Sequence, residues 1–150
     1  MFSIFFRILG VCAFCGFLAA CGPGTLETTV KADAELNPNA DNAPSPIMVQ
    51  IFQLKDDVRF NKSDYVQLIN EPDKALGNDL LKSYQHFFNP GEQQKLPDVV
   101  LLEQTRFIGI VSAYRNIDNA IWRTIHPVKE GSSYDLEVDL GRLTLKSTLD

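Results

Sequence analysis

Thiols, imidazoles and clustered carboxylates are the side chains in this 150-residue sequence that could take part in chemistry. The two histidines, His86 and His126, lack the H-x-x-x-H or H-E-x-x-H spacing that brings two imidazoles to one zinc ion. The sequence has neither a G-x-S-x-G turn for a nucleophilic serine nor a glycine-rich phosphate loop. Asp135, Glu137 and Asp139 share one strand face, and an exposed sheet face explains them better than a cation site. The thiols therefore carry the main chemical signal.

The first two cysteines lie in a short apolar stretch near the N-terminus. Cys12 and Cys15 fall within Ile8 to Leu18, which is too short for a membrane-spanning helix of about 20 residues. This stretch has the pattern of a signal-peptide core, so we expect both cysteines to be removed with residues 1–20. Only Cys21 would then remain, which excludes a disulfide and leaves no other thiol for catalysis or metal binding.

Cys21 ends the sequence Leu18-Ala19-Ala20-Cys21, which resembles the lipobox of bacterial lipoproteins. Small side chains let the backbone enter a peptidase, the Cys21 thiol takes a diacylglyceryl thioether, and cleavage frees the Cys21 amine for a further acyl chain. Several acyl chains hold a protein firmly, whereas one binds only marginally. We therefore expect a covalent lipid on Cys21 and no other cofactor. The alternatives are an ordinary secretory signal that leaves Cys21 free, and an uncleaved inner-membrane anchor.

The residue after the cysteine indicates the membrane. In enterobacterial-type sorting, an aspartate at that position tends to hold a lipoprotein at the inner membrane. Here the residue is Gly22. The sequence therefore favours the outer membrane, with the folded domain facing the periplasm.

The rest of the chain has the composition of one globular domain, with 45% hydrophobic and 22% charged residues. The net charge is -5 and no cluster of lysine or arginine occurs, which argues against a nucleic-acid partner. We expect a signal peptide over residues 1–20, the acylated cysteine and a tether over 21–25, and the folded domain over 26–150.

Alternating apolar and polar residues predict strands. Residues 26–36 alternate with period two, as in a half-buried strand. Residues 47–54 and 105–114 are apolar on both faces, so we expect them to be central strands. Further strands are expected at 80–88, 120–128 and 134–140. Short strands separated by turns are typical of an antiparallel β-sandwich in the all-β class.

A small helical insertion is expected over residues 59–81. Asn61 or Ser63 could cap its first helix, Pro72 would end or restart it, and Gly77 would end the second helix. Helices this short are not stable alone, so they must pack on the sheet.

A long polar loop follows the first predicted strand. Residues 37–46 read NPNADNAPSP, and the prolines and asparagines stop both strand and helix. A hairpin needs only about two to five residues here, so the loop is either a tolerated surface loop or a binding loop. The candidate binding residues are Asn37, Pro38, Asn39, Ala40, Asp41, Asn42, Ala43, Pro44 and Ser45.

Several weak motifs in a fixed order resemble the outer-membrane lipoprotein family of type VI secretion systems, the TssJ (SciN-like) family. The motifs are LNPN (36–39), PSPIMVQIFQLKD (44–56), NPGE (89–92), FIGIVSAYR (107–115) and WR (122–123). They cover most of residues 27–145 and follow the lipobox.

The resemblance implies a transthyretin-like β-sandwich that is not an enzyme and needs no small-molecule substrate. Such proteins anchor the secretion machine's membrane complex by binding the periplasmic C-terminal domain of an IcmF-like inner-membrane protein, TssM. Their known contact is the loop between the first two strands, which corresponds here to residues 37–45. Lipids on Cys21 would insert into the inner leaflet of the outer membrane and hold the domain at its surface.

Two other functions remain open from the residues alone. A periplasmic ligand-binding lipoprotein for a glycan or peptide would need a concave aromatic patch, such as Trp122 with Tyr114 and Tyr134. A metal-dependent hydrolase would need His86 and His126 within about 5 Å of each other, together with a carboxylate.

Overall fold

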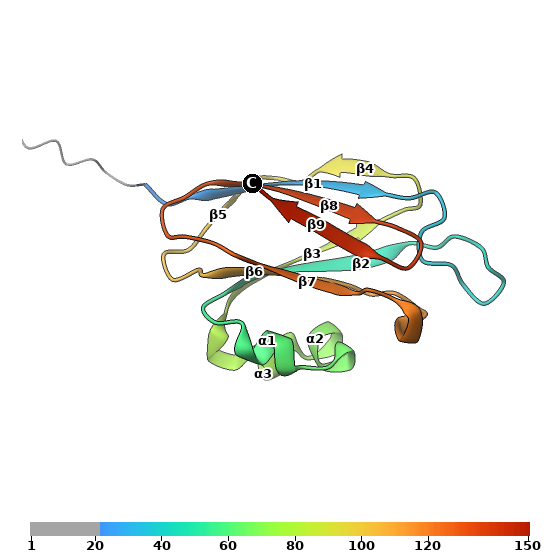
Figure 1. Cartoon of the computed structure of the whole chain (residues 1–150), viewed down its shortest axis with the longest axis horizontal. Coiled ribbons are helices and arrows are strands. Elements are labelled where there is room, and N and C mark those ends of the chain that lie inside the picture. The colour runs from blue at the N-terminus through green and yellow to red at the C-terminus, as the bar shows by residue number, and fades with distance from the viewer. Residues whose placement is uncertain (1–21) are drawn as a thin grey trace, which may run out of the picture.

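The chain forms two β-sheets packed face to face, with short helices against the outer side of one sheet (Figure 1). The structure is a computed structural model that describes residues 22–150. The predicted signal peptide, lipobox and Cys21 lie outside the described residues. Within the described part, no helix is both long and apolar enough to cross a membrane.

The first sheet has five strands and contains the chain's first and last strands. These are β1 (Thr25–Ala32), β4 (Gln93–Lys95), β5 (Val99–Val100), β8 (Tyr134–Leu140) and β9 (Leu145–Leu149). The order is β4-β1-β8-β9, and β5 also pairs with β1. The β1–β8 pair is parallel and the other pairs are antiparallel, so the expectation of a wholly antiparallel sandwich needs this correction. Alternation along one strand does not reveal its neighbour's direction, because both pairings have the same side-chain period.

The second sheet has four strands and is antiparallel throughout. They are β2 (Ile47–Leu54), β3 (Leu80–Phe88), β6 (Phe107–Ser112) and β7 (Arg123–Pro127), in the order β3-β2-β6-β7. β2 and β6 are the two central strands, which confirms the prediction from their apolar faces. The all-β class, the sandwich and the small helical layer are likewise as predicted.

The main core lies between the two sheets. Leu26 and Val30 of β1 belong to the same buried cluster as Val49 and Ile51 of β2 and Val138 of β8. All five side chains are at most 3% exposed. These are the alternate positions expected to face inward along each strand.

A second apolar cluster joins the outer face of the second sheet to the helices. The helices are α1 (Val58–Lys62), α2 (Tyr65–Asn70), α3 (Pro72–Leu76) and the 3-10 helix η1 (Gly77–Asp79). Phe60, Leu68 and Leu76 of this layer are fully buried with Phe52 and Val111 of the sheet. This layer explains why β2 and β6 are apolar on both faces.

The caps of the helical layer differ from the prediction at Asn61 and Ser63. α2 begins after Asp64, whose Oδ1 accepts from the Gln67 N–H at 2.8 Å while Gln67 Oε1 accepts from the Asp64 N–H at 3.0 Å. This reciprocal pair is a capping box, and the D-x-x-Q spacing was its signal in the sequence. Pro72 begins α3, which confirms the prediction that a helix restarts there.

The first strand is shorter than its alternation suggested. β1 ends at Ala32 instead of continuing to Leu36, and it begins at Thr25, which was expected to belong to the tether. The Asp33 carboxylate accepts a hydrogen bond from the Glu35 N–H at 2.7 Å. Such a local side-chain bond competes with the ladder and turns the chain.

Candidate functional site

The candidate site is the loop from Asp33 to Pro46, which connects β1 in one sheet to β2 in the other. It protrudes from the end of the sandwich opposite to the start of β1 (Figure 1). Residues 40–44 at its tip are exposed, whereas Leu36 and Asn37 at its base are buried. The loop therefore has a buried base and an exposed tip.

Asn37 holds the base of the loop and is only 2% exposed. Its Nδ2 donates to the Pro46 carbonyl at 2.8 Å, and its Oδ1 accepts from the Arg115 N–H at 2.9 Å. Its own backbone N–H donates to the Arg142 carbonyl at 3.0 Å. Asn37 has a positive φ of 46°, a conformation that asparagine adopts more readily than most residues. One residue thus ties together both ends of the loop and two neighbouring segments.

Asn39 organises the tip. Its Oδ1 accepts from the backbone N–H groups of Asp41 at 3.0 Å and Ala43 at 2.9 Å. Its own N–H donates to the Ala43 carbonyl at 2.9 Å. Pro38 and Pro44 flank this turn and fix φ on either side of it. The tip is therefore shaped by internal hydrogen bonds and by restricted backbone.

A positively charged side chain beside the loop comes from the β8–β9 turn. The guanidinium of Arg142 donates to Glu35 Oε2 at 3.0 Å and also to Asn42 Oδ1. Asp41 is exposed at the tip. This end of the molecule presents mainly polar atoms and offers hydrogen bonds rather than a deep apolar pocket.

Two tyrosines brace the segment that supports Asn37. Tyr114 is 1% exposed, and its hydroxyl donates to the Gly141 carbonyl at 3.0 Å. Burial raises the pKa of Tyr114, which keeps its phenol protonated. The hydroxyl of Tyr65 in α2 donates to the Tyr114 carbonyl at 3.0 Å. These bonds connect the helical layer to the strand end next to the loop.

The residues of the hydrolase hypothesis are far apart. His86 lies on β3 and His126 on β7, the two edge strands of the second sheet, with β2 and β6 between them. Three strand spacings alone amount to roughly 14 Å, and the two residues are also offset along the strands, since His86 aligns through Val49 with Ser112 and His126 aligns with Ile108. Over residues 22–150, no three His, Cys, Asp or Glu side chains are close enough to hold a metal ion. The requirement that the two histidines converge is therefore not met.

The aromatic patch of the ligand-binding hypothesis does not form either. Tyr134 begins β8, whereas the Tyr114 hydroxyl bonds to Gly141, just beyond the end of the same strand. Trp122 packs edge-on against Tyr65, with ring centroids 5.3 Å apart. Tyr114 and Trp122 therefore pack against the apolar core.

Arg123 has a role that the sequence did not suggest. Its guanidinium donates to the carbonyls of Phe60, Asn61 and Ser63 at 2.9–3.1 Å. It also lies over the Trp122 ring, 4.8 Å from the centroid. The fork of donors satisfies carbonyls at the end of α1, which have no partners within such a short helix.

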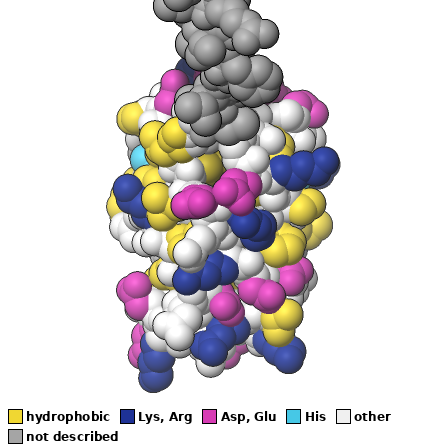
Figure 2. Space-filling view, turned by 90° about the vertical axis from the view of Figure 1, so that its left-hand side faces the viewer, with side chains coloured by type: hydrophobic (Ala, Val, Ile, Leu, Met, Phe, Trp, Pro, Cys, Tyr) yellow, Lys and Arg dark blue, Asp and Glu magenta, His cyan; other side chains and the backbone are white. Residues whose placement is uncertain are grey.

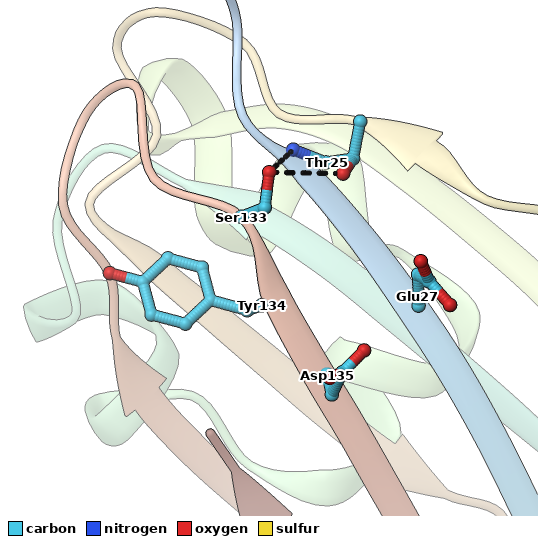
Figure 3. Close-up of a pocket in the computed structure, with 5 residues that line it drawn as sticks. All are labelled: Thr25, Glu27, Ser133, Tyr134 and Asp135. Carbon is cyan, nitrogen blue, oxygen red and sulfur yellow. Dashed lines mark hydrogen bonds between the residues drawn. The ribbon is translucent and has the colours of Figure 1, made fainter.

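A shallow depression lies at the other end of the first sheet (Figure 3). It holds about 160 Å³ and is lined by Thr25, Glu27, Ser133, Tyr134 and Asp135. Ser133 Oγ lies 3.1 Å from both the N and Oγ1 atoms of Thr25, so these groups bond to each other. The depression is smaller than the roughly 300 Å³ at which small-molecule sites usually begin.

A two-sheet sandwich with a helical layer and a protruding, internally bonded loop defines a structural or binding module. A family model described as type VI secretion lipoprotein (VasD, EvfM, TssJ) matches residues 24–143. The chain belongs to this family, which is a lipoprotein component of the secretion system and not an enzyme family. Membership also implies association with a membrane.

Solved structures of relatives share this fold. The type VI secretion lipoprotein TssJ1 from Pseudomonas aeruginosa is 30% identical with a TM-score of 0.81, over 86% of this chain and 98% of its own. The membrane-bound Lip from Serratia marcescens is 27% identical with a TM-score of 0.78, over 85% and 97%. A chain in a structure described as the TssM C-terminal domain from EAEC is 21% identical with a TM-score of 0.71, over 83% and 97%. A comparison with curated protein sequences returns no significant match.

Proposed function

We propose that this chain is the outer-membrane lipoprotein of a type VI secretion membrane complex and acts as an adaptor, not as an enzyme. Lipid on Cys21 would fix one end in the inner leaflet of the outer membrane. Residues 37–45 would bind the periplasmic C-terminal domain of the IcmF-like component, TssM. The observation that carries the proposal is the internally bonded loop at the end of the sandwich opposite to the start of β1.

The position of the loop suits a contact away from the membrane. Cys21 precedes β1 by a short tether, Gly22 to Gly24, and β1 then runs for eight residues toward the loop. Eight strand residues span roughly 26 Å. A lipid at the start of β1 would therefore leave the loop tip in the periplasm, within reach of an inner-membrane partner.

The internal bonds of the loop favour binding. Asn37 and Asn39 hold the loop before any partner arrives, so little conformational entropy would be lost on association. The exposed tip is polar, which suits a modest interface strengthened by several copies in one assembly. Support for the partner comes from the family and from the similar chain in the structure described as the TssM C-terminal domain.

Calorimetry tests the partner contact. Residues 22–150 would be titrated with the periplasmic domain of the IcmF-like protein from the same genome. A first variant replaces residues 38–45 by a Gly/Ser linker and keeps Asn37. A control variant replaces residues 129–132 in the β7–β8 turn, at the opposite end, in the same way.

We expect the loop variant to lose binding and the control to bind as the wild type does, with all circular dichroism spectra alike. Unchanged binding by the loop variant would contradict the site. No binding by the wild-type domain would contradict the partner.

A further inference from the structure

Two apolar side chains are exposed at the end of the sandwich where β1 begins. Val100 is 52% exposed and Leu102 is 41% exposed. Between them Leu101 is buried, and its N–H donates to the Gly24 carbonyl at 2.8 Å. Val100 pairs with Thr25 in the β1–β5 ladder. The exposed pair therefore lies beside Gly24 and Thr25, at the end that Figure 2 shows, where apolar side chains lie among charged ones.

A buried amide holds this pair in place. Gln53 of β2 is fully buried, and its Nε2 donates to the Val100 carbonyl at 3.0 Å. Its Oε1 accepts from the Leu102 N–H at 2.9 Å and from Thr105 Oγ1 at 2.8 Å. Moving the segment so that either side chain turned inward would break the bonds of Gln53 to Val100 and Leu102, and losing hydrogen bonds of a buried amide is costly. The fold thus keeps both apolar side chains outside.

Single exposed apolar residues are ordinary, so exposure by itself identifies no partner. Here the short length of chain before β1 points to the membrane as the partner. Three residues, Gly22 to Gly24, separate Cys21 from Thr25, and the four steps between the two Cα atoms reach at most about 14 Å when the chain is extended. The headgroup region of each leaflet is roughly 5–8 Å thick. If Cys21 carries lipid, as the proposed function requires, the end of the sandwich with Val100 and Leu102 cannot move far from the bilayer.

The charges nearby point to an apolar contact. Arg106 pairs with Glu130 at 3.0 Å and also donates to the Glu103 carbonyl at 2.7 Å, so its positive charge already has partners. The exposed carboxylates of Asp98 and Glu103 would not favour an anionic surface. Attraction to lipid charge is therefore weak here, and the contact would depend little on salt.

We propose that Val100 and Leu102 insert into the headgroup boundary of the membrane that holds the lipid on Cys21. The acyl chains alone limit the distance of the domain from the bilayer but leave it free to tilt. A second, apolar contact fixes its orientation. The domain then stands with the 37–46 loop directed away from the membrane.

The test uses the full chain, expressed and processed in bacteria and reconstituted in phosphatidylethanolamine/phosphatidylglycerol vesicles. Val100→Cys and Leu102→Cys each carry an environment-sensitive nitrobenzoxadiazole label. The matched control is Ile121→Cys, because Ile121 is 55% exposed and its N–H bonds to Leu143 in the β8–β9 turn at the loop end. Cys21 is blocked by its thioether, so each variant carries one reactive thiol.

We expect the labels at 100 and 102 to shift their emission to the blue and to be quenched by spin-labelled lipid, while the label at 121 is not. Equal emission and quenching at all three positions, with acylation of Cys21 confirmed by mass spectrometry, would overturn this inference alone. A blue shift that appears only after adding the IcmF-like periplasmic domain would also overturn it, in favour of a protein contact. A mass without acyl chains would overturn both this inference and the proposed anchor.

Discussion

Asn37 and Asn39 restrict the conformation of the loop by hydrogen bonding, and the prolines restrict it by fixing φ. Asn37 bonds to Pro46 and Arg115 at the base, and Asn39 closes the tip through Asp41 and Ala43. A proline-rich loop without these bonds would be stiff but would not have one shape. Asparagine therefore decides the conformation that a partner would meet.

Replacing Asn37 by alanine should lower the free energy of unfolding by about 2–4 kcal/mol. The variant leaves the Arg115 N–H and the Pro46 carbonyl without partners and places alanine at positive φ. Urea unfolding measures the loss. The control is Asp41→Ala, whose exposed side chain should matter by less than about 0.5 kcal/mol. Equal stability of the two variants would contradict the role of Asn37.

His126 should make stability depend on pH. Burial lowers the pKa of His126 below its usual value near 6.5, and its Nε2 lies 2.7 Å from Ser147 Oγ. The unfolded state therefore binds a proton more readily than the folded state, and stability falls as pH drops from about 6.5 through the lowered pKa. Unfolding measured at pH 7.5 and pH 5 should show a smaller fall for His126→Gln than for the wild type. Identical falls would contradict this linkage.

At the scale of elements, β7 and the residue before it add polar and aromatic contacts to the apolar packing of the helical layer. β7 contributes Arg123, which binds carbonyls at the end of α1, and the neighbouring Trp122 contacts Tyr65 of α2. Helices of five or six residues are not stable alone, so these contacts replace the stability that length would give. The layer in turn covers the outer face of β2 and β6.

Substituting Arg123 by lysine should loosen α1 even though the charge is kept. An ammonium group cannot match the planar fork that reaches Phe60, Asn61 and Ser63. We expect a loss of about 1–3 kcal/mol and faster amide hydrogen exchange in the helical layer than in the sheets. Arg115→Lys is the matched control because the Arg115 side chain is exposed. Exchange rates in α1 equal to those of the wild type would refute this role.

Gly109 lets the helical layer approach the sheet. A β-carbon at Gly109 would lie 2.8 Å from Cε2 of Phe60, which is fully buried. Gly109→Ala should therefore cost about 1–3 kcal/mol by overpacking. Gly22→Ala is the control, since no atom lies within 4 Å of its added carbon. A second test is the double variant with Phe60→Leu, which should show coupling between the two sites. Additive losses would contradict a direct clash.

Sequence patterns predicted the strands and helices well where the pattern involves only neighbouring residues. The doubly apolar strands 47–54 and 105–114 required cover on both faces, which the first sheet provides on one side and the helical layer on the other. The parallel β1–β8 pair was not predictable, because the partner of β1 is more than 100 residues away. The hydrogen bonds of Arg123 were not predictable either, because the carbonyls that accept them are about 60 residues away in the sequence. The bond between Asn37 and Arg115 is of the same kind, since the two residues are 78 positions apart and no sequence pattern links them.

At the scale of the whole molecule, the two ends of the sandwich differ. β1 starts beside the exposed Val100 and Leu102, and it runs toward the loop that Asn37 holds. A sandwich is rigid along its strands because its core is continuous from end to end. Force applied at one end would therefore reach the other without unfolding a flexible linker. This is the property that an adaptor between a membrane and a partner protein requires.

Vesicle co-sedimentation tests the adaptor most directly. Acylated wild-type protein on phospholipid vesicles would be mixed with the soluble periplasmic domain of the IcmF-like partner and centrifuged. Two variants complete the set: Cys21→Ser, which removes the proposed site of lipid attachment, and the Gly/Ser replacement of residues 38–45.

The account predicts that the partner sediments with vesicles carrying the wild-type protein and stays in solution with either variant. Sedimentation of the partner with the loop variant, at the wild-type level, would contradict the claim that one end of this molecule holds the membrane while the loop at the other end holds the partner.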